Sequence, residues 1–498
     1  MTSEPARDAR TARAATPVRA AEGEGAGLSA ARRALAGERA WLVGGAVRDR
    51  LLGRPGDPDV DIVVAGDVRA AARRLGRATG AAAFELSGTH GAWRVTDREG
   101  AWQVDLVALQ GGSLAADLAA RDVTINAMAE PLAGGDVVDP YGGRADLAAR
   151  RLRMVSPQAF DADPLRVLRL ARLATELGFA IDPETRAAAR LRAPRVADVA
   201  AERVFAELKR IIGADDALRG LRLLDELDLV PATLPELDAL RGVEQSVYHH
   251  RDVFGHTLEV LEMAIGLERD PADPLGDDLA EGVGAFLAEP LADGLTRGGA
   301  LRWAALLHDA AKPETRVELP GGRVGFPHHD RVGADLARAV LTRLRASERL
   351  RAHVAGMTRH HLRLGFLVHE APLDRRAVHR YLVAIAPVEI DVTLLTVADR
   401  LATRGRNAEE AIARHLDLAR VLVAAGLERR AAPPAQPLIR GDVLADALGM
   451  APGPWLGDVL AALEEARYAG ELDTPQDAIV LARELLDARA QPAAREAT

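Results

Sequence analysis

The sequence predicts a small α/β head followed by a long, mostly helical body. Short apolar segments that end in glycine are typical of strands, and they cluster between about residues 40 and 109. From about Leu114 onward, almost every segment has helical periodicity. The length of 498 residues, with 48% hydrophobic and 28% charged residues, is typical of a globular protein of three or four domains.

The head is predicted to begin with a strand, a turn and a short helix. The apolar segment WLV (41–43) ends at Gly44-Gly45, and AVRDRLLG (46–53) has helical character up to Gly53. DIVVAG (61–66) and QVDLVAL (103–109) are predicted to be buried strands, with further strands between them.

The helical body is interrupted by prolines and glycines. Breaks are expected at Pro157, Pro183, Pro194, Pro231 and around Gly242. The stretch 268–298 is predicted to be a loop or short helices, and AAPPAQP (431–437) a linker. The predicted division is a disordered leader (1–36), a head (37–155), a helical neck (156–240), a larger helical domain (241–430) and a helical tail (431–498).

Composition restricts the classes of protein. No apolar run approaches the ~20 residues that cross a bilayer, and the Ala-, Arg- and Gly-rich first ~35 residues lack the apolar core of a secretory signal. The chain has no cysteine, which excludes disulfides and thiolate metal sites and fits a cytoplasmic protein. The net charge of −9 has the wrong sign for RNA binding, so a basic groove is expected where arginines are dense, from Arg144 to Arg210.

The carboxylates of DPDVDIVV (57–64) indicate a metal site. If Asp59 and Asp61 lie on one strand, both side chains point to the same face, and paired carboxylates with room for phosphates suit magnesium. Asp105, on another apolar strand, would complete a two-metal site for in-line phosphoryl displacement. The alternative is an ordinary solvated turn, since Gly56 and Pro58 adjoin the pair.

The Gly44-Gly45 turn follows a strand and opens a helix, so its amides can face a phosphate that Arg48 also reaches. Further along, DPLRVLRLAR is predicted to start a helix with Arg166, Arg169 and Arg172 on one broad face. Asp163 accepts hydrogen bonds and arginine donates them, so together they can pair with a cytosine or adenine edge. An ordinary strand-to-helix turn and a solvated basic face are the alternatives.

Five segments together resemble one family. VGGAVRDRLLG (43–53), DPDVDIVV (57–64), DLAARDVTINAMA (117–129), DPYGGRADL (139–147) and DPLRVLRLARLATELGF (163–179) resemble the class II tRNA nucleotidyltransferase and bacterial poly(A) polymerase family. The resemblance covers about residues 40 to 180. It implies an α+β nucleotidyltransferase head of the DNA polymerase β superfamily, which adds nucleotides to an RNA 3′ end without a template. CCA addition to tRNA from CTP and ATP is the leading expectation.

The resemblance assigns roles to the head residues. Asp59 and Asp61 would bind catalytic magnesium, with Asp105 as the third carboxylate, and Gly44, Gly45 and Arg48 would contact the triphosphate. The remaining implied nucleotide contacts are Arg121 and Asp122 near the sugar and phosphates, Asp163 and Arg166 at the Watson–Crick edge, and Arg169 and Arg172 on or behind that surface. Two positions depart from the family pattern: Ala162 stands where Glu is usual, which weakens the assignment of the base, and Ala120 stands where Arg is frequent.

A second set of residues offers nitrogen and oxygen ligands for a divalent transition metal: His256, His308, Asp309 and Asp399. His308 is expected on a helix that Pro313 ends. Their order, with Lys312 and FPHHDRVGA (326–334), resembles the HD phosphohydrolase superfamily, and His329 or His328 with His360 or His361 could extend the site toward a second metal. Activity on cyclic phosphates or phosphomonoesters is one expectation, and a metal-free scaffold the other.

The closing segment 437–482 resembles the C-terminal part of HD-containing family members and is predicted to form two or three amphipathic helices, either as an RNA-holding tail or simply packed on the body.

Three other functions remain open. One is poly(A), CC or A addition. Another is a metal-dependent phosphohydrolase with an RNA-binding head. The last is a non-enzymatic RNA-binding scaffold.

Overall fold

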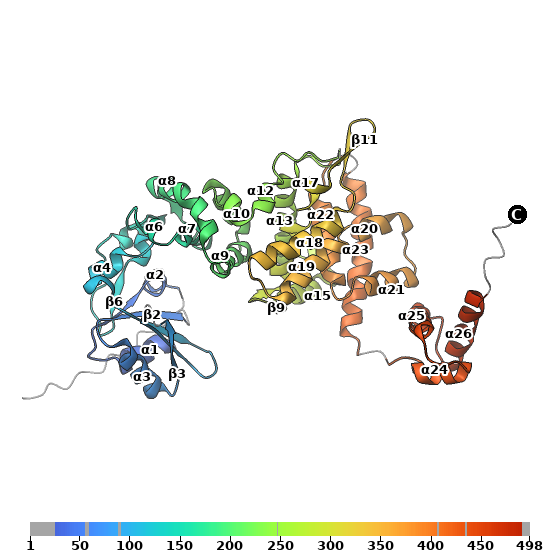
Figure 1. Ribbon diagram of the computed structural model, residues 1–498, viewed down its shortest axis with the longest axis horizontal. Coiled ribbons are helices and arrows are strands. Elements are labelled where there is room, and N and C mark those ends of the chain that lie inside the picture. Colours follow the sequence, from blue (N-terminus) through green and yellow to red (C-terminus); the bar gives the residue numbers. More distant parts are fainter. Residues whose placement is uncertain are drawn as a thin grey trace, which may run out of the picture. The chain divides into compact units, whose positions relative to one another are not determined.

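The computed structural model describes residues 25–54, 59–87, 91–246, 248–405, 408–433 and 436–490. The chain divides into two compact units, Met1–Ala193 and Pro194–Thr498 (Figure 1).

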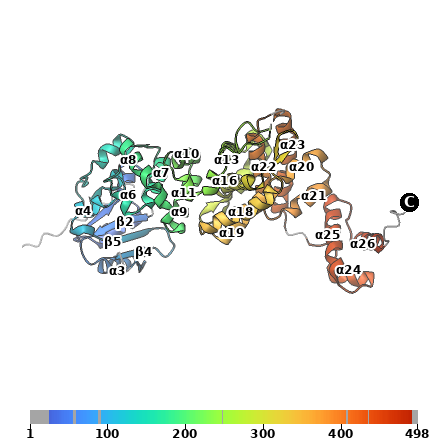
Figure 2. The same cartoon turned by 45° about the horizontal axis from the view of Figure 1, so that its top comes forward.

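The head contains a mixed sheet with strand order β3-β4-β5-β2-β1-β6 in its described part. Figure 2 shows β2, β5 and β4 side by side in this sheet. Only the central pair, β2 and β5, is parallel; the other neighbours are antiparallel. The strands are β1 (Ala40–Val43), β2 (Asp59–Val64), β3 (Ala82–Ser87), β4 (Ala92–Thr96), β5 (Gln103–Ala108) and β6 (Ala129–Pro131). The predicted strands at 41–43, 61–66 and 103–109 are therefore confirmed within two residues of their ends.

Two helices cover one face of this sheet, α1 (Ala26–Ala34) and α3 (Val68–Thr79). Val60 and Ile62 of β2 and Leu106 of β5 are buried, as is Leu75 of α3. Helix α1 falls inside the predicted disordered leader, so that prediction is wrong for residues 26–34. The apolar stripe of α1, which includes the buried Leu28, packs against α3 and β5. This burial stabilises the helix, because helix propensity alone is not sufficient for so short a segment. The rest of the predicted leader, residues 1–24, lies outside the described residues.

A second, smaller core lies around the ends of β1 and β2. It contains Val43, Val63, Leu118, Ala127 and Ala129. Because side chains alternate along a strand, Val63 shares its face of β2 with Asp61 and Asp59. Helix α2 (Gly45–Leu51), helix α4 (Leu114–Ala119) and the 3-10 turn η2 (Thr124–Asn126) contribute to this region. The helix expected after Gly44-Gly45 is thus confirmed as α2.

The remaining elements of the first unit are mainly helices. They are α5 (Gly143–Ala148), α6 (Ala159–Ala162), α7 (Leu165–Leu177), α8 (Pro183–Arg192), the paired strands β7 (Arg151–Leu152) and β8 (Ala180–Ile181), and the 3-10 turn η1 (Gln110–Gly112). The predicted arginine-bearing helix is confirmed as α7, which follows Pro164 and ends at Gly178 with a left-handed φ of 69°.

The second unit begins with four helices, α9 (Ala201–Gly213), α10 (Ala217–Glu226), α11 (Val230–Thr233) and α12 (Pro235–Asp238). The centre of its larger part is built from α13 (Val253–Arg269), α16 (Arg297–Leu307) and α22 (Glu389–Ala402), which pack on one another. Every residue of α16 from Gly298 to Leu307 is buried. Around this centre lie α18 (His329–Arg343), α19 (Glu348–His360), α20 (Arg363–Leu367), α21 (Arg375–Ala384) and α23 (Ala408–Ala431).

Two segments differ in detail from the sequence prediction. Residues 268–298 form short helices as expected, α14 (Ala272–Leu275) and α15 (Asp277–Ala288), but also a small hairpin of β9 (Pro290–Ala292) and β10 (Leu295–Thr296). Pro313 does not end the helix that precedes His308: α16 ends at Leu307, and Pro313 lies in the first turn of α17 (Lys312–Thr315). Proline is tolerated there because first-turn amides have no partner within the helix. A second hairpin, β11 (Val317–Leu319) and β12 (Arg323–Gly325), follows.

The last described residues form three helices with a core of their own, α24 (Gly441–Leu448), α25 (Pro454–Ala469) and α26 (Pro475–Ala490). Helix α25 contacts α21, where Arg376 pairs with Glu465 and Glu471. Among the described helices, none is by itself both long and apolar enough to span a membrane; α21 and α22 meet that test only as a pair bent by 99°.

Candidate functional sites

A row of carboxylates crosses the centre of the head sheet. In the parallel pairing of β2 with β5, Asp61 lies directly opposite Asp105, and Asp59 opposite Gln103. Both aspartates of β2 are exposed while Val60 between them is buried, so Asp59 and Asp61 share one face, as predicted. Residues paired in a parallel ladder point to the same side, which brings Asp105 beside Asp61. Three acids on neighbouring strands form the oxygen-rich donor set that hard divalent cations prefer.

Arg94 adjoins this row, and sequence reasoning missed it. It lies opposite Asp105 on β4 and donates two hydrogen bonds to that carboxylate, from Nε and from Nη2, each 2.7 Å long. These hydrogen bonds, together with the charges of Asp59 and Asp61, raise the pKa of Arg94. Each oxygen of Asp105 retains a second lone pair, so the pairing orients the carboxylate without using up its capacity as a ligand. Only the strand register reveals Arg94, because it lies 11 residues from Asp105 in sequence.

The Gly44-Gly45 turn lies next to the acidic row. Gly44 has φ 73° and ψ −137°, a conformation open to glycine but not to residues with a Cβ. A Cβ at Gly44 would lie 3.1 Å from Nη1 of Arg121 and 3.8 Å from Oδ2 of Asp61. A Cβ at Gly45 would meet the Arg48 guanidinium at 3.3 Å. The turn, both arginines and Asp61 are therefore neighbours, so the predicted triphosphate residues converge on the predicted carboxylates.

Arg48 is tied to a second group of predicted nucleotide contacts through Asn126. Arg48 donates from Nη1 to Asn126 Oδ1 at 2.8 Å, and Asn126 Nδ2 donates to Asp122 Oδ1 at 3.2 Å. The Arg169 guanidinium lies 3.4 Å from Asp122 Oδ2. Burial would raise the pKa of Asp122, but Arg169 and the Val123 amide outweigh it and lower that pKa. The segment DVTINAMA suggested Asp122 but gave no periodicity that could single out Asn126.

The predicted base-reading residues lie at the start of α7. Asp163 is partly exposed and accepts a hydrogen bond from the Leu165 amide, while Arg166 Nη1 donates to the Ala159 carbonyl oxygen. Arg172 is buried and pairs with Glu176 at 2.7 Å. Arg172 therefore belongs to the packing behind this surface rather than to its exposed part.

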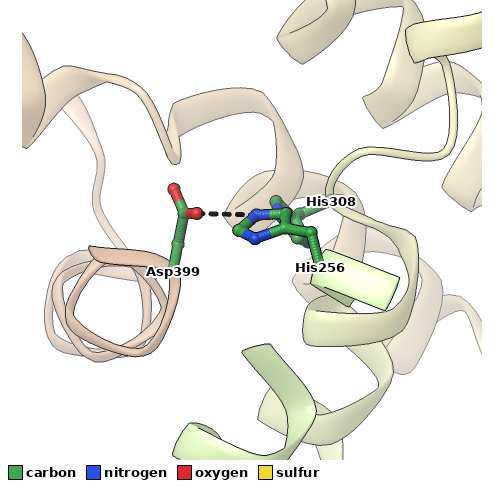
Figure 3. Close-up of side chains that lie close together, drawn as sticks. All are labelled: His256, His308 and Asp399. Atoms are coloured by element: carbon green, nitrogen blue, oxygen red, sulfur yellow. Dashed lines mark ion pairs between the residues drawn. The ribbon is translucent and has the colours of Figure 1, made fainter. Parts of the chain in front are cut away.

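A second cluster forms in the helical unit around Asp309. His256 comes from α13, Asp399 from α22, and His308 with Asp309 directly follow the end of α16. Asp399 Oδ1 lies 3.0 Å from His256 Nε2, and Figure 3 shows the carboxylate pointing at this ring with His308 close behind. Asp309 Oδ2 lies 3.2 Å from His308 Nε2 and 2.6 Å from the Lys312 ammonium. The four residues predicted for this site are thus together.

Two further histidines complete the cluster. His329 Nε2 lies 3.4 Å and His361 Nε2 3.9 Å from Asp309 Oδ1. The candidate ligand atoms fall into two groups, His256 with His308 and Asp399, and Asp309 with His329 and His361; within each group they lie within 4.8 Å of one another. Of the alternatives left open by the sequence, His329 and His361 are therefore the ones brought into the cluster. The described residues place His328 and His360 in neither group.

The histidines present the nitrogen that a metal needs. His308, His329 and His361 each direct Nδ1 at the carbonyl oxygen of the residue three positions earlier, those of Ala305, Phe326 and Thr358. A carbonyl can only accept, so Nδ1 carries a proton and Nε2 is the ring nitrogen that faces the cluster. The Nε2 atoms of His256 and His308 are buried and make no well-aligned hydrogen bond in the described part of the chain. Buried ring nitrogens gathered with carboxylates are a donor set suited to a divalent transition metal.

The charges of the cluster agree with this role. Burial opposes ionisation of Asp309, but His308 and Lys312 outweigh it and hold the pKa of Asp309 well below its usual range. His256 likewise holds the pKa of Asp399 down in spite of burial. Burial lowers the pKa of His361 to about 4, so this ring is neutral near pH 7. Both carboxylates are thus ionised and His361 is uncharged, as metal ligands must be. Burial would lower the pKa of His308, but Asp309 outweighs it and raises that pKa, so a metal ion would compete with a proton for this ring.

Three family models match the chain in order. They are the poly A polymerase head domain over residues 40–104 and 91–153, the probable RNA and SrmB-binding site of polymerase A over 178–241, and the HD domain over 253–404. The A-adding tRNA nucleotidyltransferase of Deinococcus radiodurans is 40% identical over 88% of this chain and 94% of its own length. The chain belongs to the tRNA nucleotidyltransferase and poly(A) polymerase family.

Other members of the family differ in the nucleotides named in their activities. The CC-adding tRNA nucleotidyltransferase of Thermus thermophilus is 35% identical over 88% of this chain and 92% of its own. The multifunctional CCA protein of Halorhodospira halophila is 38% identical over 65% of this chain and 73% of its own. The sequence-based recognition of this tRNA nucleotidyltransferase family is confirmed.

Solved structures confirm the fold. The CCA-adding enzyme of Thermotoga maritima, in a complex with tRNA, has a TM-score of 0.59 at 18% identity and covers 92% of this chain and 94% of its own. The CCA-adding enzyme of Bacillus stearothermophilus, in a complex with CTP, has a TM-score of 0.58 at 20% identity and covers 93% of this chain and 99% of its own. The predicted α+β head followed by a mostly helical body with an HD domain is therefore correct. Divalent metal dependence follows from these two domains.

Proposed function

We propose that this tRNA nucleotidyltransferase adds the nucleotides of the CCA end to tRNA, using CTP and ATP. The observation that supports it most directly is the register of β2 on β5, which puts Asp61 beside Asp105 with Asp59 on the same face. Such carboxylates would hold magnesium, which would supply stabilisation of charge for in-line displacement on the triphosphate by the RNA 3′-hydroxyl. In this proposal Asp59, Asp61 and Asp105 would hold the metal, and Arg94 orients Asp105 through its two hydrogen bonds.

The neighbouring residues would hold the incoming nucleotide. The Gly44-Gly45 turn begins α2, and amides at a helix N-terminus bind phosphate oxygens well. Arg48 and Arg121 supply positive charge beside that turn. Asp163 and Arg166, at the start of α7, offer an acceptor and donors to the base edge. With tRNA as its substrate, the enzyme would act in the cytoplasm.

Terminal A addition is the second candidate for the product, because the A-adding relative is 40% identical over 94% of its length. Purified protein should be incubated with tRNA that lacks CCA, and separately with tRNA that ends in CC, with CTP, ATP or both. Full CCA addition to the first tRNA supports the proposal. Addition of one A, only to tRNA ending in CC, would assign the A-adding activity instead. Unlimited A addition would indicate poly(A) synthesis, and no incorporation would rule out nucleotidyl transfer. The Asp61→Ala variant provides the inactive control.

We also propose that the cluster around Asp309 binds a divalent transition metal and hydrolyses phosphate esters. The grouping of His256, His308 and Asp399, whose candidate ligand atoms lie within 4.8 Å of one another, supports this over a metal-free scaffold. Lys312, held between Asp309 and Gln245, adds a cation beside the cluster. Asp399 is the most accessible of the predicted ligands, with 26% of its side chain exposed, so a phosphate would approach from its side.

The two activities can be separated by mutation. Metal content and hydrolysis of 2′,3′-cyclic nucleotides and p-nitrophenyl phosphate should be measured for wild type, Asp309→Asn and Asp61→Ala. We expect Asp309→Asn to lose metal and hydrolysis but keep nucleotide addition, and Asp61→Ala to show the opposite pattern. Purified protein without bound metal and without hydrolysis would leave the cluster as a structural element only. Hydrolysis that survives Asp309→Asn would place it elsewhere.

A further inference from the structure

Asn126 joins two parts of the head that the proposed function uses separately. Its side chain is buried, and it lies in the 3-10 turn η2. Its amide oxygen accepts the 2.8 Å hydrogen bond from Arg48, and its amide nitrogen donates the 3.2 Å hydrogen bond to Asp122. One partner follows the Gly44-Gly45 turn on α2. The other faces Arg169 on α7.

Both partners of Asn126 are themselves fixed. Arg48 donates from Nε and Nη2 to Asp49 at 2.9 and 2.6 Å. Asp122 accepts from the Val123 amide at 2.8 Å and lies against Arg169 at 3.4 Å. The result is one continuous chain of polar contacts from α2 to α7, with a single neutral side chain in the middle.

The amide of Asn126 matches both of its neighbours. Arg48 has donors and no acceptor, and ionised Asp122 has acceptors and no donor, so the link must accept on one side and donate on the other. Alanine would offer neither and would leave the buried Asp122 oxygen without one of its donors. Aspartate would keep the contact to Arg48 but place a second carboxylate against Asp122.

We propose that Asn126 is a positioning residue that couples the triphosphate-binding turn to the base-reading helix. It sets Arg48 and Asp122 at a fixed separation, so that phosphate contacts at one end favour the correct placement of α7 at the other. This inference rests on the proposed nucleotide addition. It adds that the choice of base depends on a residue that does not touch the nucleotide.

The test compares Asn126→Ala and Asn126→Asp with wild type and with Thr124→Val. Thr124 lies in the same turn, is also buried and donates one hydrogen bond to Asp146, outside the chain of contacts. Its valine variant therefore controls for a lost buried hydrogen bond. KM and kcat for CTP and for ATP should be measured on tRNA that lacks CCA and on tRNA that ends in CC. Loss of one buried hydrogen-bonded link changes binding by roughly tenfold.

We expect Asn126→Ala to raise the nucleotide KM about tenfold and to reduce the ratio of correct to incorrect incorporation by a similar factor. The Thr124→Val variant should keep the wild-type nucleotide KM and the wild-type ratio of correct to incorrect incorporation. Arg48→Ala combined with Asn126→Ala should cost less than the sum of the single changes, since both break the same link. A folded Asn126→Ala enzyme with wild-type KM and wild-type discrimination would overturn the proposal.

Asn126→Asp keeps the test decisive should the alanine variant not fold. Its carboxylate still accepts from Arg48, so we expect a folded protein whose discrimination falls because Asp122 is repelled; unchanged discrimination would again overturn the proposal. Failure of wild type to add any nucleotide is a separate outcome, which removes the proposed function itself.

Discussion

Replacing Gly44 with alanine tests how the triphosphate turn and the acidic row depend on each other. Gly44 has φ 73° and ψ −137°, and holding a residue with a Cβ in such a region costs about 1–3 kcal/mol. The new Cβ would also lie 3.1 Å from Arg121 Nη1, closer than ordinary van der Waals contact, so the guanidinium must move. Arg121 is the cation beside Asp61, and its displacement should lower nucleotide affinity.

Gly53→Ala is a matched control. Gly53 follows the same helix α2 and also has a positive φ, 68°, but a Cβ there would meet nothing within 4 Å. Both variants should lower the melting temperature of the head by roughly 2–4 °C per kcal/mol of strain. Only Gly44→Ala should also lower kcat/KM for the nucleotide, by about tenfold for ~1.4 kcal/mol of lost binding.

Thermal melting followed by circular dichroism and steady-state incorporation of radiolabelled nucleotide measure the two effects. Equal activity of the two folded variants would refute the reasoning, because it would mean that the space beside Gly44 is not needed by Arg121. Wild-type stability of Gly44→Ala would refute the conformational part of the argument.

Three more outcomes follow from contacts in the two units. Arg94→Gln should lower kcat for nucleotide addition about tenfold. The melting temperature should hardly change, because a partly exposed ion pair contributes about 1 kcal/mol or less to stability. An unchanged kcat would argue against a role of Arg94 in orienting Asp105. Asp309→Asn should lower metal content, measured by mass spectrometry of the purified protein, and leave nucleotide addition intact; retained metal would contradict the assignment. Burial lowers the pKa of His415 from 6.5 to about 4. The unfolded chain therefore takes up a proton at His415 below pH 6.5 while the folded protein does not, so this contribution to stability is complete above pH 6.5 and is lost as the pH falls toward 4. On acidification from pH 7.5 to 5, urea denaturation should show that His415→Gln loses less free energy of unfolding than wild type, by about 2 kcal/mol; an equal loss would exclude His415 as its source.

Much of the head could be predicted because its signals are local. The strands at β1, β2 and β5 are short apolar runs, and the Gly44-Gly45 turn marks the start of α2. The alternation of side chains along β2 was enough to put Asp59 and Asp61 on one face. The same local signals failed for α1, whose stability depends on packing against α3 and β5 rather than on its own sequence.

The helical unit shows the same division. Apolar periodicity predicts the helices that carry His256 and Asp399. Pro313, which the sequence predicts to end a helix, instead lies in the first turn of α17. The choice between His328 and His329 was also beyond the sequence. They are adjacent, and only the start of α18 and its packing decide which ring faces Asp309.

The sequence by itself determined the types of element, the chemistry-bearing residues and the family, since these depend on residue identity and on spacing within one element. The tertiary structure alone decided which of those residues meet. The parallel register of β2 on β5 sets Asp61 against Asp105, and the antiparallel register of β4 brings Arg94 to the same carboxylate. The side chain of Asn126 lies between Arg48 and Asp122 because η2 packs against α2. Such contacts depend on strand register and helix packing, which are set by the whole core, so no local pattern in the chain encodes them.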